Sequence, residues 1–181
     1  LKELPLSENI ETVSILKKVN LANRALAELK GVSKTVPNSS IFINSLVLQE
    51  AKDSSEIENI ITTQDELFKS DIDIAGINKA TKEVKRYSSA LKKGFELITH
   101  NKILISRYII EIQQILENNN AGIRTQAGTA LKNVATGKII YTPPQDFATI
   151  SKLMKNLEDY INTEDATDPL IKMAIIHYQF E

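Results

Sequence analysis

Apolar residues recur at helical spacing along most of the chain, and the sequence therefore predicts a mainly helical protein. A glycine at position 31 should end the first helix, and Pro37 and Asn38 should precede the second. The isoleucine-rich segment 103–117 should be a more buried helix than the one before it. The predicted helices cover residues 11–30, 39–52, 63–70, 78–98, 103–117 and 146–162.

Residues 118–145 break this pattern. They hold three of the six glycines of the chain and the adjacent Pro143 and Pro144. Gly137 precedes a short β-branched and aromatic run that the two prolines end, which predicts a short strand. We therefore expect an all-α fold with a small β-hairpin. Loops of this length are uncommon in compact domains unless they have a function.

The last fourteen residues, DPLIKMAIIHYQFE, predict another helix with Asp168 as N-cap and Pro169 at its first position. This helix stays apolar and in phase up to Glu181, without a stop signal. The pattern is typical of a chain cut inside an element. Met173, Ile176 and Phe180 should then lack packing partners.

The composition narrows the classes of function. With 22 basic and 23 acidic residues, the chain has no strong net charge that would indicate a nucleic-acid partner. Lysines gather between positions 79 and 102, but Glu83 and Glu96 interrupt them, which favours a solvated helix face. The absence of cysteine excludes disulfides and thiolate metal sites and predicts a cytoplasmic protein. No apolar run is long enough for a membrane span.

Few residues are candidates for catalysis. Only two histidines exist. His100 lies in a polar connection, residues 99–102, and should be a surface residue, whereas His177 has apolar neighbours and should be a hydrogen-bonded core histidine. The sequence holds no metal-ligand spacing and no glycine-rich phosphate loop. No active site can be assembled from these residues.

The segment 53–59, DSSEIEN, is the most specific feature. Ser55 and Glu58 have the spacing of a capping box, in which each side chain accepts a hydrogen bond from a free backbone N–H. Ser54 and Glu58 are four residues apart and would share one face of a helix. Considered locally, the segment is most simply a helix start or a corner between two helices.

Several segments together resemble the Fic family of protein adenylyltransferases. Ser54-x-x-x-Glu58-Asn59 resembles the inhibitory motif (S/T)-x-x-x-E-(G/N), between LVLQEAKDS and ITTQDELF. AGIRTQAGT followed by GKIIYTPP resembles the flap of the family. The final HYQFE resembles the residues that lead into the catalytic motif H-P-F-x-(D/E)-G-N-G-R, which the chain does not contain. The resemblance implies a Fic-type helical bundle, with an N-terminal region at 1–75 and the first part of the core at 76–181.

The resemblance also implies functions for these residues. The intact protein would transfer AMP from ATP, with Mg²⁺, to a Ser, Thr or Tyr hydroxyl of a target protein, and self-modification or a homodimer would be compatible with this. Glu58 would pair with a motif arginine and so inhibit the enzyme, Ser54 would support it, and Asn59 would adopt a left-handed or helix-ending conformation. This chain alone would supply no catalytic residue and bind no cofactor. The strand that would pair with the main chain of the target comprises Lys138, Ile139, Ile140, Tyr141 and Thr142.

Two other classes of protein remain open at this point. One is an antitoxin-like module that inhibits a separate catalytic partner, although such a module would not need a target-docking hairpin. The other is a helical scaffold or DNA-binding domain, which the nearly balanced charge disfavours.

Overall fold

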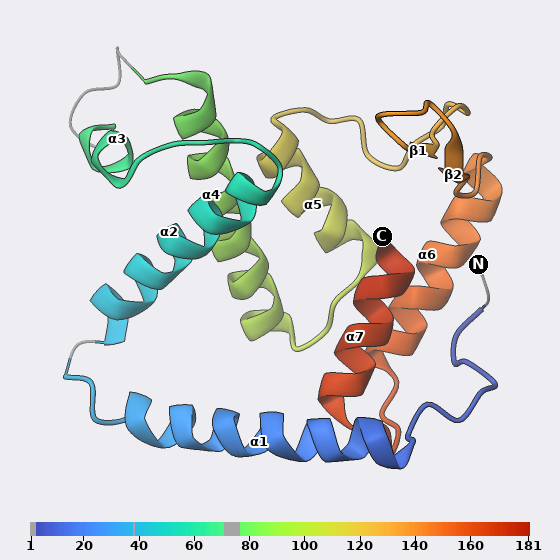
Figure 1. The fold of residues 1–181 in the computed structure, drawn as a ribbon, viewed down its shortest axis with the longest axis horizontal. Coiled ribbons are helices and arrows are strands. Elements are labelled where there is room, and N and C mark those ends of the chain that lie inside the picture. The colour runs from blue at the N-terminus through green and yellow to red at the C-terminus, as the bar shows by residue number, and fades with distance from the viewer. Residues whose placement is uncertain (1–2, 38, 71–76) are drawn as a thin grey trace. The chain divides into compact units, whose positions relative to one another are not determined.

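The computed structural model describes residues 3–37, 39–70 and 77–181 (Figure 1). It confirms a mostly helical fold with one small antiparallel sheet. The second helix starts at Ser39 as predicted, whereas Asn38 before it lies outside the described residues. In chain order the elements are α1 (Val13–Ser33), α2 (Ser39–Ile57), α3 (Gln64–Lys69), α4 (Lys79–Asn101), α5 (Ser106–Glu117), β1 (Leu131–Lys132), β2 (Ile139–Tyr141), α6 (Phe147–Asn162) and α7 (Pro169–Phe180).

The chain forms two compact units that alternate along the sequence. Unit 1 comprises Leu1–Gly31, Leu104–Ser106 and Ile123–Glu181, and unit 2 comprises Val32–Ile103 and Arg107–Gly122. The hairpin belongs to unit 1, and the segment around Glu58 belongs to unit 2. The division at residue 75 that the resemblance implies stays a prediction.

Unit 2 is built on the packing of α2 and α3 against α4. Its core consists of Ala51, Leu67 and Val84, which are almost fully buried. Around it pack the half-buried side chains of Leu48, Ile60 and Tyr87. This cluster joins the second half of α2 to the first half of α4.

The apolar stripe predicted for α4 is only partly buried. Val84 is inaccessible to solvent, but Phe95 is 71% exposed, and Leu91 and Ile98 are exposed as well. The other buried residues of α4 are small: Thr81, Ser88, Ala90 and Gly94. A Cβ atom placed on Gly94 would lie 3.0 Å from Cδ1 of Ile112 on α5, so this glycine allows α4 and α5 to approach closely.

Several predicted helix boundaries are wrong. Helix α1 continues through Gly31 to Ser33, because this glycine has no left-handed backbone that would stop it. Helix α2 extends five residues beyond position 52, to Ile57. Helix α5 starts at Ser106, because the backbone of Leu104 bonds to the Asn162 side chain instead of forming a first helical turn. It is also mostly half-buried, with Tyr108 as its buried residue.

Unit 1 has its own core, in which Leu4, Leu157 and Tyr160 are buried and Ile175 and Ile176 of α7 pack against them. Asp168 caps α7 as predicted, since its carboxylate accepts from the N–H of Leu170 (2.8 Å). The second carboxylate oxygen accepts from the side-chain amide of Asn23 on α1 (3.1 Å). In the described part of the chain, no helix combines the length and apolarity that crossing a membrane requires.

Candidate functional site

The segment 54–59 forms the C-terminal end of α2. The N–H of Asn59 donates to the carbonyl of Glu56 (3.0 Å), and the N–H of Ile60 donates to the carbonyl of Ser55 (2.9 Å). Asn59 has a φ of 62°, in the left-handed region. These two bonds and this conformation define a Schellman motif, the helix-ending turn that favours Gly or Asn at its left-handed position. Glu58 is therefore the last residue before the turn.

The capping box predicted for Ser55 and Glu58 is wrong. Ser55 lies in the last turn of α2 and is buried, so it cannot be an N-cap. The capping box of this region comes eight residues later: Glu66 accepts from the N–H of Thr63, and Thr63 accepts from the N–H of Glu66. The same residue pattern occurs at both places, but only Thr63 follows an extended stretch and starts a helix.

Glu58 presents its carboxylate to solvent. The residue is exposed, and within the described ranges its side chain forms no hydrogen bond or ion pair. The Ser54 hydroxyl donates to Glu50 (2.7 Å), one turn earlier on α2, and so does not point toward Glu58. The structure thus places an exposed carboxylate at the C-terminal end of α2. The inhibitory role of Ser54, Glu58 and Asn59 stays a prediction.

The predicted flap is a β-hairpin. Strand β2 covers Ile139–Tyr141 and pairs with β1, with Leu131 opposite Tyr141 and Lys132 opposite Ile139. All three residues of β2 are exposed. Lys138 precedes the strand, and Thr142 follows it. Because β2 has one partner in this sheet, its other edge is available to a further strand.

Local side-chain bonds shape the hairpin turn. The Asn133 carboxamide oxygen accepts from the N–H groups of Ala135 (3.0 Å) and Thr136 (2.9 Å). Gly137 then adopts a φ of 68°, where a side chain would cause strain, and its N–H donates to the carbonyl of Asn133. The N–H of Asn133 donates to the carbonyl of Lys138 (2.8 Å). The turn is thus specified by its own residues.

Two residues that the sequence reasoning missed hold the base of the hairpin. Gln145 donates to the carbonyl of Thr129 (3.0 Å) and accepts from the N–H of Gly128 (2.7 Å), so its side chain bridges the two arms. Arg124 donates to the carbonyl of Pro144 (2.7 Å). The sequence signal was weak: a glutamine after two prolines and an arginine in a glycine-rich stretch. All three bonds join positions that are 16 to 20 residues apart in the chain.

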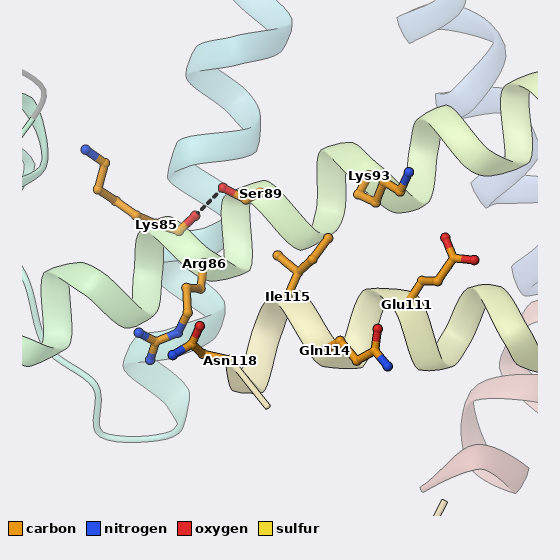
Figure 2. A pocket seen from close by; sticks show the side chains of 8 residues that line it. All are labelled: Lys85, Arg86, Ser89, Lys93, Glu111, Gln114, Ile115 and Asn118. Carbon is orange, nitrogen blue, oxygen red and sulfur yellow. Dashed lines mark hydrogen bonds between the residues drawn. The ribbon is translucent and has the colours of Figure 1, made fainter. Parts of the chain in front are cut away.

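The lysine-rich helix α4 borders an open pocket of about 610 Å³ with α5, which Figure 2 shows. Two of its cations bond to carbonyls at the ends of other helices. Lys85 donates to the carbonyl of Ser70, the C-cap of α3 (3.1 Å). Arg86 donates to the carbonyl of Leu116 in the last turn of α5 (3.2 Å). A cation at the C-terminus of a helix is favourable, so these two residues stabilise unit 2. The lysine-rich helix is therefore not only a solvated face, as the sequence predicted.

The two histidines differ in part from their predictions. His100 is exposed as expected, although it lies in the last turn of α4 and not in a connection. The prediction that His177 is a core histidine is wrong. Its side chain is 73% exposed, and its Nε2 lies 3.5 Å from Oε1 of Glu181, four residues further on. That acidic neighbour was overlooked in the sequence.

ATP and Mg²⁺ have no fitting set of groups in the part of the chain that the structure describes. No group of three His, Cys, Asp or Glu side chains there could hold a metal ion. Among the described residues, the glycines with a left-handed backbone lie between positions 122 and 137. This region does not lead directly into the N-terminus of a helix, where a phosphate could bind. Binding of ATP and Mg²⁺ by the intact protein stays an expectation.

A helical protein with an exposed hairpin and a carboxylate at a helix end matches known family models over most of its length. Residues 16–96 match the model described as Fic/DOC family N-terminal. Residues 103–181 match the model described as Fic/DOC family. The chain belongs to the Fic/DOC family, whose members catalyse AMPylation or related transfers.

Proposed function

We propose that this chain is the regulatory and target-docking part of a self-inhibited protein adenylyltransferase, which transfers AMP from ATP to a hydroxyl side chain of a target protein. The main support is the geometry of Glu58. The residue ends α2, its carboxylate is exposed, and the left-handed Asn59 turns the chain away directly after it. A carboxylate in this position can accept a bidentate pair from an arginine.

The inhibition would act by competition for that arginine. A guanidinium that is bound to Glu58 is not free to bind a γ-phosphate. Helix α2 is fixed on α4 by its buried core, so Glu58 would approach the arginine without ordering a flexible loop. A preorganised contact of this kind loses little conformational entropy when it forms.

The hairpin would bind the target. An extended segment of a target can add to the free edge of β2 through main-chain hydrogen bonds, and this mode of binding tolerates many side chains. The bridge of Gln145 across the base and the local bonds of Asn133 would keep that edge in place. The target hydroxyl would then be set by the position of the strand.

The test compares Glu58→Gln with Glu56→Gln in the full-length gene product. Both substitutions remove one charge and keep the shape of the side chain. Glu56 is a suitable control because it is exposed in the same turn, and its carboxylate pairs with the half-buried Lys52 (3.3 Å). AMP incorporation from labelled ATP should rise about tenfold or more for Glu58→Gln, because a hydrogen bond to a charged group is worth roughly 1.5–3 kcal/mol. It should stay near the wild-type level for Glu56→Gln.

Two results would contradict the proposal. Equal activation by both variants would show a general effect of charge, and an unchanged rate for Glu58→Gln would remove its inhibitory role. If Glu58→Gln instead relieved inhibition only of a separate, added Fic enzyme, the antitoxin-like alternative would hold.

A further inference from the structure

A buried hydrogen-bond chain connects the segment after Glu58 to helix α4. The hydroxyls of Thr62 and Thr81 lie 2.7 Å apart, and the two residues are only 4% and 1% exposed. The Thr62 hydroxyl also lies 3.1 Å from Oε2 of Glu66. Thr62 follows Glu58 by only four residues, and it is the first buried polar residue after the Schellman turn.

The direction of these hydrogen bonds follows from the chemistry of the groups. An ionised carboxylate only accepts, so the single hydroxyl proton of Thr62 is donated to Glu66. Thr81 must therefore donate its proton to Thr62. The hydrogen bond from the N–H of Thr63, followed by that from Thr62, keeps the pKa of Glu66 below its ordinary value of 4.5. At neutral pH the carboxylate is thus the charged acceptor at the end of the chain.

The same carboxylate also binds the start of α4. Its Oε1 accepts from the side-chain amide of Asn78 (3.0 Å), and Asn78 in turn caps α4 by accepting from the N–H of Thr81 (2.8 Å). These hydrogen bonds therefore form a closed ring that joins Thr62, Glu66, Asn78 and Thr81. Beside it, Ile60 packs on the core of unit 2. Within four residues of Glu58, the half-buried Ile60 and the buried Thr62 thus both contact unit 2.

We infer that Thr62, Glu66 and Thr81 are positioning residues for Glu58, which hold the end of α2 on α4 so that the Glu58 carboxylate stays in its inhibitory place. This inference rests on the proposed function. A helix end frays readily unless its last residues are anchored. Loss of the buried Thr62–Thr81 bond would leave the buried Thr62 oxygen without the hydrogen bond that it accepts, and the segment 58–62 would move away from α4.

The experiment measures AMP incorporation by the full-length protein and its Thr81 variants. Thr81→Val keeps the shape and removes the hydroxyl, and incorporation should rise at least threefold. Thr81→Ser restores the hydroxyl and should return the rate to the wild-type level. The matched control is Ser88→Ala, which removes a buried hydroxyl two turns further along α4. It should not activate.

The double variant Thr81→Val with Glu58→Gln identifies the route of the effect. If Thr81 acts through Glu58, the double variant should be no more active than Glu58→Gln alone. Hydrogen exchange of residues 54–62 should also accelerate in Thr81→Val, whereas exchange in α6 should not change. A residue with a merely stabilising role would lower activity and would not raise it.

The outcomes separate this inference from the proposed function. If Glu58→Gln activates and Thr81→Val does not, the positioning role is wrong and the inhibitory role of Glu58 stands. Additive activation in the double variant also overturns it. If Glu58→Gln fails to activate, the proposed function fails and the inference with it. If Thr81→Val does not fold, AMP incorporation is measured for Glu66→Gln instead, at the exposed end of the hydrogen-bond chain.

Discussion

At the scale of single residues, Asn59 has the strongest local effect. The sequence motif allows Gly or Asn at this position, and the structure gives the physical reason. The Schellman turn requires a left-handed residue directly after Glu58, and L-residues with a bulkier or branched side chain adopt this conformation at a cost. The identity of Asn59 therefore follows from backbone geometry and needs no contact of its side chain.

This leads to a prediction for stability. Asn59→Gly should leave the free energy of unfolding within about 0.5 kcal/mol of wild type, because glycine adopts the left-handed region freely. Asn59→Ala should lower it by roughly 1 kcal/mol. The control is Asn44→Ala on an exposed turn of α2, which should be neutral or stabilising, because alanine is the better helix former. Urea unfolding followed by circular dichroism measures all three. Equal effects of alanine at positions 44 and 59 would contradict the turn.

Residue patterns alone could not distinguish the two possible capping boxes. Ser55-x-x-Glu58 and Thr63-x-x-Glu66 have equal spacing. The choice depends on whether the preceding backbone is already helical, and α2 runs five residues further than its apolar pattern indicated. The predicted burial of His177 is wrong for a similar reason. Burial of this residue depends on which face of α7 packs against the rest of unit 1, and the sequence does not show that face.

At the scale of elements, α4 organises unit 2 through its charged as well as its apolar side chains. Lys85 and Arg86 are neighbours in sequence and therefore point in different directions around the helix. Each bonds to a carbonyl near the end of a different helix, α3 or α5. A lysine-rich stretch predicts a solvated surface from its composition, whereas these carbonyl acceptors come from tertiary packing that the sequence does not reveal.

The Arg86 bond should contribute measurably to stability. Arg86→Met keeps much of the apolar stem and removes the hydrogen bond to Leu116. We expect the free energy of unfolding to fall by about 1–2 kcal/mol, since the bond is charge-assisted but the side chain is 31% exposed. Lys92→Met, at an exposed position of the same helix, is the control and should change it by less than about 0.5 kcal/mol. If thermal unfolding shows equal losses for both variants, the bond to α5 does not stabilise the unit.

The hairpin was predicted well because its signals are local. Gly137, the two prolines and the short apolar run specify a turn and a strand within about ten residues. The structure adds Asn133 as the residue that organises the turn. The base of the hairpin could not be predicted, because the Gln145 side chain bonds to the carbonyl of Thr129, which lies sixteen positions earlier in the chain.

At the scale of the whole molecule, the helical class and the hairpin were predictable, but the two compact units were not. Periodicity shows which segments are helices and says nothing about which helices share a core. The units alternate along the chain, with Leu104–Ser106 bonded to α6 while the rest of α5 lies in unit 2.

The two separate cores lead to a final prediction. Leu67 is the largest buried side chain of the unit 2 core, and Leu157 is buried in the unit 1 core. Truncation of either leucine to alanine removes apolar contacts and leaves a cavity, which typically costs about 2–5 kcal/mol. We expect Leu67→Ala to accelerate hydrogen exchange in α2 and α4, and Leu157→Ala to accelerate it in α6 and α7. Each variant is the control for the other, because the residue type is the same. A uniform loss of protection in both units from either change would show a single cooperative core, and the two units would then be a geometric division without energetic meaning.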